Sequence, residues 1–555
     1  HYNLGNTLKE LGQLEAAVKS IKRALSIDYS NQLFWAGFSD ILQAIRFKSF
    51  DDSMVPYLLQ ALQQPSIRPK DISGAIISML RHHPNLHIAL EACKTGAIKE
   101  EINQLADQLT SIPLLLQLME LCPIPDTEIE RLLRLIRQAT LRQLTDETND
   151  PGNLPFYVAL ALHCFTNEYV FLESSEETTE IEQLENKINS LLANNKPVPS
   201  LWVALLASYR PLHIFSWSSQ LSQSNSTNSI QKILTQQIDE VREEQRLRPE
   251  IKALSTINNN VSQIVREQYE ENPYPRWVNP GLSAKPKTIR TVLQELKMDL
   301  DRTGQHFPSH PEILIAGCGT GQHSLGTASR FSNSSVLAVD LSLSSLSYAI
   351  RKTQELGISN IDYMHADILE LHKLDRQFDL IESAGVLHHM AEPLAGWKVL
   401  VDLLRPRGLM KIGLYSEIAR QHIVETRAFI AKNNYDSSQE AIRQCRVNII
   451  EMPTNTDSKI PKVLNSNDFY SLSTCRDLLF HVQEHRFTLP EIETALKELG
   501  LAFIGFELQD HQVQNRFKEL DPRKESLTSL PLWHQFELDH PDTFAGMYQF
   551  WVQKI

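Results

Sequence analysis

The chain has 555 residues, enough for about two to four domains that each bury a sizeable hydrophobic core. Its 42% hydrophobic and 22% charged residues are typical of soluble globular proteins. A net charge of −13 without a Lys/Arg-rich block argues against a nucleic acid partner. The six scattered cysteines predict no metal site and a reducing, cytoplasmic setting, and no apolar run approaches the about 20 residues of a membrane helix, so we expect no membrane partner.

The first 30 or so residues have the spacing of a helix pair, with a glycine at the turn and small residues on the second helix. The residues with this spacing are Leu4, Leu8, Gly12, Ala17, Ile21 and Ala24. The pattern resembles a tetratricopeptide repeat. A single repeat cannot bury its own apolar face, so we place residues 1–36 at the end of a longer array. Because the chain begins with His1 rather than Met, we expect it to be a fragment.

Residues 37–215 are predicted to form an all-α domain without a catalytic constellation. Glu128–Leu141 is amphipathic at helical period, and Leu154–Leu172 is apolar enough to be a buried helix. Residues 216–258 are predicted to be a linker followed by a charged helix. Ser216–Ser229 is rich in Ser, Asn and Gln and is expected to be the flexible part.

An apolar run at Ile313–Ala316 ends in three glycines at alternate positions, Gly317, Gly319 and Gly321. This pattern predicts a strand that leads through a tight turn into a helix. Such turns occur where backbone must approach a ligand closely, because glycine lacks the Cβ atom that would block the approach. The spacing is tighter than the dinucleotide fingerprint, with Gln322 following, and no phosphate-binding Gly-Lys-Ser/Thr is present.

Further strands are predicted at Val336–Asp340, Ile361–Asp367 and Phe378–Ala384, and Leu403–Gly413 is predicted to hold a helix end, a turn and a fifth strand. A carboxylate at the tip of the second strand, here Asp340, can accept hydrogen bonds from both hydroxyls of a ribose. The alternative role for this residue and for the acid after the third strand is to cap the N-terminus of a helix.

These segments, in this order, resemble the class I S-adenosylmethionine-dependent methyltransferases. The resemblance implies a Rossmann-like α/β domain with a seven-stranded sheet and S-adenosyl-L-methionine as cofactor. It places the glycine loop under the methionine part of the cofactor, Asp340 on the ribose, and Asp367 on the adenine amino group. The implied cofactor-binding residues are Gly317, Gly319, Gly321, Asp340, Asp367, Ile368, Ser383, Tyr269 and Arg276.

The segment Tyr269–Trp277 interleaves aromatic residues with prolines, an arginine and acids. Prolines stiffen it, so its side chains are presented at low entropic cost. Similar segments precede the first strand in bacterial proteins that join such repeats to a methyltransferase, which the whole chain resembles. We expect Tyr269 or Arg276 to meet the cofactor carboxylate; the alternative is a structural brace. An amphipathic helix is predicted at Lys287–Leu300.

The C-terminal part is predicted to complete the same domain. Thr488–Glu491 fits a helix-initiating capping box, and strands are predicted at Ala502–Leu508 and Ala545–Val552. Class I methyltransferases end in this way, with the last strand antiparallel. Insertions at the carboxyl ends of parallel strands lie over the ligand crevice, so we expect a substrate lid there. The predicted domain is 259–555, with insertions at about 417–487 and 509–543.

Three histidines are candidates for a catalytic base. His481 and His485 are four residues apart in the first insertion and would share one face of a helix, and His389 lies in the segment that the resemblance places beside the reactive methyl. An amine or hydroxyl acceptor must lose a proton, which such a residue can take. The alternatives are a metal site, which needs a further ligand, and a purely structural polar helix.

The favoured function is methyl transfer to a protein or peptide acceptor presented by the helical repeat arm. One alternative is a small-molecule or glycan acceptor, with the repeats used for assembly. The other is a catalytically inactive cofactor-binding or interaction module, against which the intact Gly317, Asp340 and Asp367 count. The sequence predicts neither the acceptor atom nor the oligomeric state.

Overall fold

The structure, a computed structural model, describes residues 1–95, 102–144, 151–223, 228–257, 259–271, 273–299, 307–453, 457–508 and 511–555. Several predicted features extend beyond these ranges. The parts that lie outside the described residues are 96–101 and 145–150 of the helical domain, 224–227 and 258 of the linker region, Asn272 of the aromatic segment, 300–306 of the methyltransferase domain, and 454–456 and 509–510 of the two insertions.

The chain divides into two compact units, each built from three segments. The first unit is His1–Gln245, Arg276–Gly281 and Phe429–Phe480. The second unit is Arg246–Pro275, Leu282–Ala428 and His481–Ile555. The domain boundaries predicted from the sequence stay predictions.

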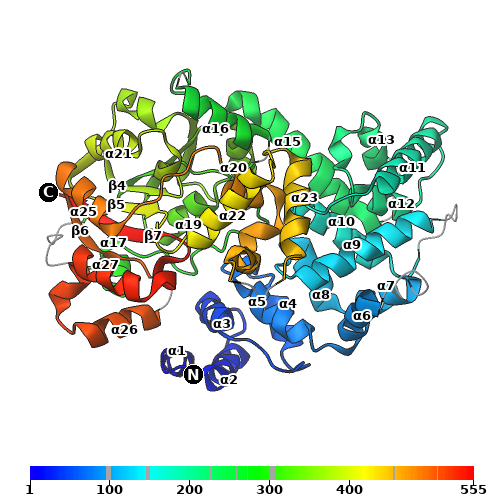
Figure 1. Ribbon diagram of the computed structural model, residues 1–555, viewed down its shortest axis with the longest axis horizontal. Helices are drawn as coiled ribbons and strands as arrows, with labels where there is room; N and C mark the ends of the chain where they lie inside the picture. Colours follow the sequence, from blue (N-terminus) through cyan, green and yellow to red (C-terminus); the bar gives the residue numbers. More distant parts are fainter. Residues whose placement is uncertain are drawn as a thin grey trace. The chain divides into compact units, whose positions relative to one another are not determined.

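All regular elements in the described part of the first unit are helices (Figure 1). Among the described residues, no helix combines the length and apolar character that crossing a bilayer requires. The α-helices of this unit are α1 (Tyr2–Glu10), α2 (Leu14–Ile27), α3 (Gln32–Ala44), α4 (Val55–Ala61), α5 (Pro69–Leu80), α6 (Pro84–Thr95), α7 (Ile102–Thr110), α8 (Pro113–Leu121), α9 (Thr127–Arg142), α10 (Leu154–Thr166), α11 (Ser175–Ala193), α12 (Ser200–Ala207), α13 (Ser218–Gln223), α14 (Gln231–Leu234), α15 (Glu240–Leu247), α23 (Gln439–Ile450) and α24 (Leu472–Cys475).

The predicted helix pair at the start of the chain is confirmed. Gly12 has a φ of +73° between α1 and α2, a conformation that glycine adopts without strain. Ala17, Ile21 and Ala24 on α2 are buried, and small side chains there let the helices pack closely.

Two further helices begin where the sequence predicts. Helix α9 is capped by Asp126, whose carboxylate accepts hydrogen bonds from the amides of Glu128 and Ile129 at 3.0 and 3.1 Å. Helix α10 is buried except at Pro155, but it stops at Thr166, earlier than the predicted Leu172. The reason is local backbone geometry, because Glu168 has a φ of +59° that a helix cannot contain.

The middle of the predicted first insertion belongs to the first unit, because its helix α23 forms a buried ion pair with α9 of that unit. The buried guanidinium of Arg446 on α23 pairs with the Glu130 carboxylate on α9 at 2.8 Å and donates to the Phe469 carbonyl at 2.7 Å. Removing one partner of such a buried pair is costly, so these contacts hold Phe429–Phe480 in the helical unit.

The second unit is an α/β domain with a seven-stranded sheet, as predicted (Figure 1). The strand order is β3-β2-β1-β4-β5-β7-β6, and β7 is antiparallel to both of its neighbours. The strands are β1 (Glu312–Ala316), β2 (Ser335–Asp340), β3 (Ile361–His365), β4 (Phe378–Ala384), β5 (Leu404–Leu414), β6 (Leu501–Phe506) and β7 (Tyr548–Lys554). The α-helices are α16 (Asn260–Glu271), α17 (Ile289–Glu295), α19 (Gln322–Arg330), α20 (Leu343–Glu355), α21 (Pro393–Asp402), α22 (Gln421–Lys432), α25 (Leu489–Glu498), α26 (His511–Leu520) and α27 (Leu530–Asp539).

Alternating side chains of the central strands fill two hydrophobic cores. On β1, Ile313 and Ile315 belong to one core, whereas Leu314 and Ala316 belong to the other. Successive side chains of a strand point to opposite faces, so an apolar run of this kind is a strand covered on both sides. The sheet is therefore buried, and ligands can reach it only at the ends of its strands.

The predicted turn before the fifth strand is part of β5 itself. Phe378 on β4 pairs with Leu404, but Leu380 already pairs with Leu409, so the residues between these two partners bulge out of the ladder. Arg407 lies in this bulge with a φ of +62°. The sequence correctly marks an irregular backbone before Gly408 but not the fact that the strand continues through it as a bulge.

A buried carboxylate on β4 contacts α19. Glu382 accepts hydrogen bonds from His323 Nε2 at 2.7 Å and Thr327 Oγ1 at 2.6 Å. Burial alone would raise the pKa of this carboxyl group, but His323 and the nearby Lys411 lower the pKa to about 2. The ionised form is therefore favoured by folding.

Glu382→Gln is expected to lower stability above pH 4.5, because the native interactions that depress the pKa from 4.5 to about 2 are lost. The shift corresponds to about 3 kcal/mol at most, and this contribution disappears in the wild type as the pH falls through that window. Thermal midpoints measured from pH 7 to pH 2 should show a shallower acid decline in the variant. Glu498→Gln on the exposed end of α25 is the control, and an unchanged acid profile in Glu382→Gln would contradict the assignment.

Candidate active site

The glycine loop after β1 is held by backbone hydrogen bonds to its neighbours. The amides of Gly317 and Cys318 donate to the Val339 carbonyl at 2.9 and 3.0 Å, and the Thr320 amide donates to the Tyr274 carbonyl at 3.2 Å. Gly319 has a φ of +51°, and a Cβ atom there would lie 2.6 Å from the Tyr274 oxygen. Glycine is thus required by the protein's own packing as well as by any close approach of a ligand.

Asp340 at the end of β2 connects this loop to the next helix. One carboxylate oxygen accepts the Gly319 amide at 2.7 Å, and the other accepts the Ser342 amide at 2.9 Å. Burial raises the pKa of Asp340, and these two hydrogen bonds act against that rise. Each carboxylate oxygen has a second lone pair, so the group can accept two more hydrogen bonds. That capacity fits the paired hydroxyls of a ribose.

The other predicted cofactor residues lie at neighbouring strand ends. Asp367 follows β3, is buried, and accepts the Leu369 amide at 3.0 Å. Ile368 is buried beside it and belongs to one of the two cores. The Ser383 hydroxyl on β4 donates to the Ala316 carbonyl at 3.1 Å, which joins the ends of β4 and β1. Carboxyl ends of adjacent parallel strands are where α/β sheets bind ligands.

Tyr269 lies at the same edge because α16 contacts the start of α20. Its carbonyl accepts a hydrogen bond from the Ser342 hydroxyl at 3.1 Å. Its ring stacks on Tyr274 at 5.9 Å and lies 6.1 Å from the ring of His481. Arg276 belongs to the first unit, where its guanidinium lies 4.3 Å from the centre of the Phe165 ring. Their roles toward a cofactor stay predictions.

Two of the predicted catalytic histidines are in contact. The rings of His389 and His481 stack with centres 3.7 Å apart, and both residues are buried. His389 Nδ1 lies 2.7 Å from the Gln483 carbonyl, and His481 Nδ1 lies 3.1 Å from the Gln483 amide. A carbonyl only accepts, so His389 carries its proton on Nδ1. The amide only donates, so the lone pair of His481 is on Nδ1.

The tautomers give the two rings different capacities. Neutral His389 has its lone pair on Nε2 and is suited to accept a proton. Neutral His481 has its proton on Nε2 and is suited to donate a hydrogen bond. Burial, together with His389, lowers the pKa of His481 to about 2, so it is a poor base at neutral pH.

His485 is placed differently from the sequence prediction. The helical turns that precede it end at Phe480, so His481 and His485 do not share a helical face. His485 is exposed, and its ring packs against Phe487 with centres 4.4 Å apart. The π-helical geometry of the preceding turn and the irregular backbone after it separate the two histidines.

A polar network that sequence reasoning missed surrounds the histidines. The ring of Tyr415 lies 3.8 Å from that of His388, and the Arg420 guanidinium lies 3.6 Å from the Tyr415 ring centre. Arg420 also pairs with the buried carboxylate of Glu484 at 3.1 Å. These residues come from three separate stretches of the chain, at 388, 415–420 and 484, and follow no short motif, so only the fold brings the stretches together.

The histidine cluster contains buried polar atoms that the described part of the protein leaves unsatisfied. Neither ring nitrogen of His388 has a hydrogen-bond partner there, nor does Nε2 of His481. Burial lowers the pKa of His388 well below its ordinary value, so its ring is neutral. Orphaned buried polar groups cost free energy, which indicates that this cluster faces a bound molecule or water.

Two segments of the chain match known families. Residues 313–408 match the family described as Methyltransferase domain, and residues 1–31 match the family described as Tetratricopeptide repeat. The first segment contains the glycine loop, Asp340 and Asp367, and also His388 and His389 after β4. The second contains α1 and α2.

Individual proteins are similar over shorter stretches. An uncharacterized protein of Synechococcus sp. is 27% identical over 238 residues, which cover 41% of this chain and 56% of that protein. A ubiquinone biosynthesis O-methyltransferase of Dinoroseobacter shibae is 33% identical over 98 residues, or 18% of this chain and 38% of that enzyme. The solved structure of PKMT2 from Rickettsia typhi in complex with AdoHcy has a TM-score of 0.34 and 15% identity, covering 44% of this chain and 48% of that one.

The chain spans little more than half the length of the Synechococcus relative and less of the other two. The family match nevertheless falls on the segment whose strand ends form the site. The chain therefore carries a class I S-adenosylmethionine-dependent methyltransferase domain together with a tetratricopeptide repeat.

Proposed function

We propose that the protein transfers a methyl group from S-adenosylmethionine to a protein or peptide acceptor presented by its helical repeats, with His389 as the general base. The observation that carries the proposal is the carboxylate of Asp340, fixed by two backbone amides at the end of β2 beside the glycine loop. It provides a rigid acceptor for a ribose in the segment that matches the methyltransferase family.

The glycine loop, Asp340 and Asp367 would hold the cofactor, and Tyr269 would lie at the same edge. When bound, S-adenosylmethionine would supply an electrophilic methyl group, which the acceptor atom would take in line while the S–CH3 bond breaks and the neutral thioether leaves with its electron pair. The protein's main task is to align the two reactants and exclude water, which can contribute about 7–11 kcal/mol of barrier reduction. The buried Asp367, His389 and His481 would provide such a water-poor setting.

His389 is favoured as base over the other two candidates. The proton of an amine or hydroxyl acceptor would pass to its Nε2 as the bond to the methyl carbon forms. Its Nδ1–H is fixed by the Gln483 carbonyl, which orients the ring and stabilises the positive charge that develops. His481 would donate a hydrogen bond from Nε2 to the acceptor, and His485 is exposed on the loop.

A protein acceptor is favoured because the chain carries a tetratricopeptide repeat, a module that presents surfaces to partners. A small-molecule acceptor is the second candidate, and one relative supports it. That relative is named as an O-methyltransferase of ubiquinone biosynthesis, although only 18% of this chain aligns with it. Fold alone does not decide between the two.

Asp340→Asn is expected to weaken binding of S-adenosylmethionine by about 10- to 100-fold, because charged hydrogen bonds of about 1.5–3 kcal/mol are lost. Isothermal titration calorimetry measures the affinity. Wild-type affinity should also fall as the pH drops toward the raised pKa of Asp340, whereas the variant should lack this dependence. Asp362→Asn, at an exposed position of β3, is the control, and wild-type affinity in Asp340→Asn would remove the ribose assignment.

The acceptor class can be measured with methyl-labelled cofactor and an extract of the source organism. At a limiting concentration of labelled cofactor, label should enter the protein fraction with the wild type and much more slowly with Asp340→Asn. Label confined to the small-molecule fraction would support the second candidate and exclude a protein acceptor. Label in neither fraction would contradict methyl transfer itself.

His389→Asn is expected to lower kcat by about 10²- to 10⁴-fold while leaving cofactor affinity unchanged. The asparagine amide can still donate to the Gln483 carbonyl, but it has no lone pair where Nε2 lies. The remaining activity should rise with pH as the acceptor loses its proton unaided. His485→Asn is the matched control. Full activity in His389→Asn together with loss in His485→Asn would assign the base to His485 instead.

A further inference from the structure

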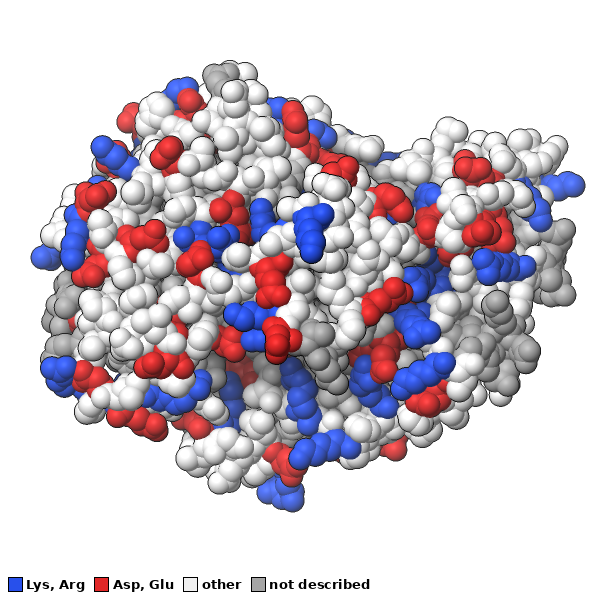
Figure 2. All heavy atoms as spheres, in the orientation of Figure 1, with Lys and Arg blue, Asp and Glu red and all other residues white. Residues whose placement is uncertain are grey.

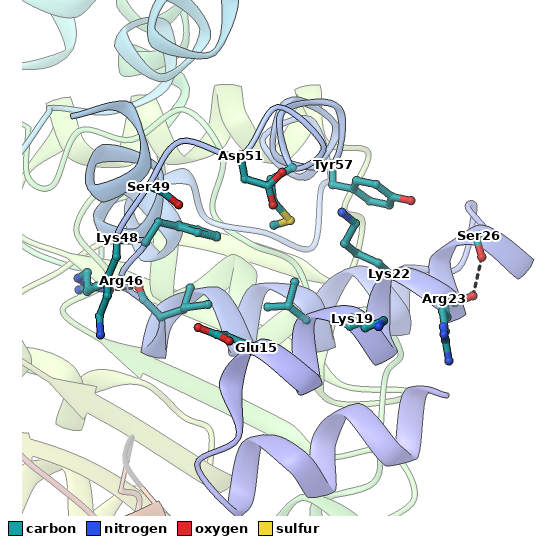
Figure 3. Close-up of a pocket in the computed structure, with 14 residues that line it drawn as sticks. Glu15, Lys19, Lys22, Arg23, Ser26, Arg46, Lys48, Ser49, Asp51 and Tyr57 are labelled. Atoms are coloured by element: carbon teal, nitrogen blue, oxygen red, sulfur yellow. Dashed lines mark hydrogen bonds between the residues drawn. The ribbon is translucent and has the colours of Figure 1, made fainter. Parts of the chain in front are cut away.

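The first unit contains a pocket of about 580 Å³ that the methyltransferase site does not use. It is formed by one face of α2, the segment from Ile45 to Asp51 and the residues that lead into α4 (Figure 3). Val18, Ile45 and Met54 are buried and form an apolar floor. The volume lies within the range of about 300–1,000 Å³ found for ligand pockets.

The rim of this pocket is basic although the chain is acidic. Its lining has five cationic side chains and two acidic ones, against a net charge of −13 for the whole chain. On the face that Figure 2 shows, Lys and Arg alternate with Asp and Glu, so local excesses of one sign are informative. The cations are Lys19, Lys22, Arg23, Arg46 and Lys48, and the acids are Glu15 and Asp51.

Two of the five cations are fixed by the protein itself. Lys22 donates to the carbonyl and hydroxyl oxygens of Ser53, each at 3.2 Å, and its ammonium lies 4.6 Å from the centre of the Tyr57 ring. Arg46 donates to the Ile45 carbonyl at 2.7 Å. These contacts give the pocket rigid walls.

The other three cationic side chains of the lining, those of Lys19, Arg23 and Lys48, are exposed. Among the residues that the structure describes, none forms an ion pair or hydrogen bond with the side chains of Lys19, Arg23 or Lys48; the Ser26 hydroxyl donates only to the backbone carbonyl of Arg23, at 2.8 Å. Lys19 and Arg23 are four residues apart on α2 and therefore lie on one face of that helix. Lys48 comes from the opposite wall. The pocket thus offers unpaired positive charge from two sides.

The distribution of charge favours an extended ligand over a compact one. In Figure 3, Arg46 and Lys48 lie at one end of the pocket, Lys22 and Arg23 lie toward the other, and Glu15 and Asp51 lie between them. A single phosphate requires donors that converge on one point. Separated cations with acids between them instead match a chain that carries carboxylates at two places and a neutral or basic residue between.

We propose that this pocket binds an extended acidic segment of a partner protein. Its carboxylates would contact Lys19 and Arg23 at one end and Lys48 at the other, and an apolar side chain would rest on Val18, Ile45 and Met54. At physiological ionic strength, charges beyond about 8 Å are screened, so the distant acids of the chain do not cancel these local contacts. The proposal concerns binding by the helical unit and is independent of methyl transfer.

The test uses the full chain and a fluorescein-labelled peptide of about eight residues, which extended spans about 26 Å. The peptide has a Glu pair at each end, with Leu and Lys between them, and fluorescence polarisation measures its binding without cofactor. Lys19→Glu/Arg23→Glu should weaken binding about tenfold or more, because two attractive pairs become repulsive. High salt should weaken wild-type binding in the same direction.

The matched control is Lys196→Glu/Arg131→Glu, which makes the same change of charge at exposed positions outside the pocket. It should bind like the wild type. Lys19→Gln/Arg23→Gln, which removes charge without reversing it, should show an intermediate loss, with circular dichroism confirming the fold. Equal loss in the control, or unchanged binding in both pocket variants, would overturn the proposal. Tighter binding of inorganic phosphate than of the peptide would overturn it in favour of a small anion.

Discussion

A hydrogen bond of 2.7 Å from the Gly319 amide to the Asp340 carboxylate is the contact on which the site depends. It joins the loop after β1 to the end of β2. The same carboxylate also accepts a hydrogen bond from the amide of Ser342, the residue that precedes α20. A Cβ atom at position 319 would lie 2.6 Å from the Tyr274 oxygen, so glycine is needed there. Because the Gly319 amide donates to the Asp340 carboxylate, a shift of the loop would disturb that hydrogen bond. The geometry of the pocket edge is thus fixed before any ligand arrives.

Burial gives this edge its chemical character. It raises the pKa of Asp340 and lowers the pKa of His388 and His481, so it disfavours charge on all three groups. A carboxylate that is short of donors gains more from ribose hydroxyls than an exposed one would, because water does not compete. Likewise, a neutral imidazole held by one fixed hydrogen bond can take a proton at its other nitrogen. In the proposed function, low dielectric surroundings would supply both the affinity for the cofactor and the reactivity of the base.

Local patterns in the sequence predicted the elements that depend on local physics. Apolar runs located β1 to β4, and the resemblance placed the antiparallel final strand. Helix α10 ends earlier than predicted because positive φ values follow it, and apolarity does not report backbone angles. The pair Arg446–Glu130 joins residues 316 positions apart, so no spacing rule could assign Phe429–Phe480 to the helical unit. The tautomers of His389 and His481 likewise depend on Gln483, a residue without any motif of its own.

The charged side chains of the protein differ in whether they are paired in its interior or exposed at its surface. The side chains of Arg420 and Glu484 are buried and pair at 3.1 Å. Glu484 also lies within 3.7 Å of Arg427 and 3.5 Å of Arg486, so its charge is compensated inside the protein. Lys19, Arg23 and Lys48 are exposed, and their side chains form no ion pair with the described residues. The charge of an exposed cation contributes little to the free energy of unfolding. A cluster of such cations can therefore bind a ligand without loss of stability. Exposure without a partner, rather than charge itself, is therefore the property that marks the pocket on α2 as a binding surface.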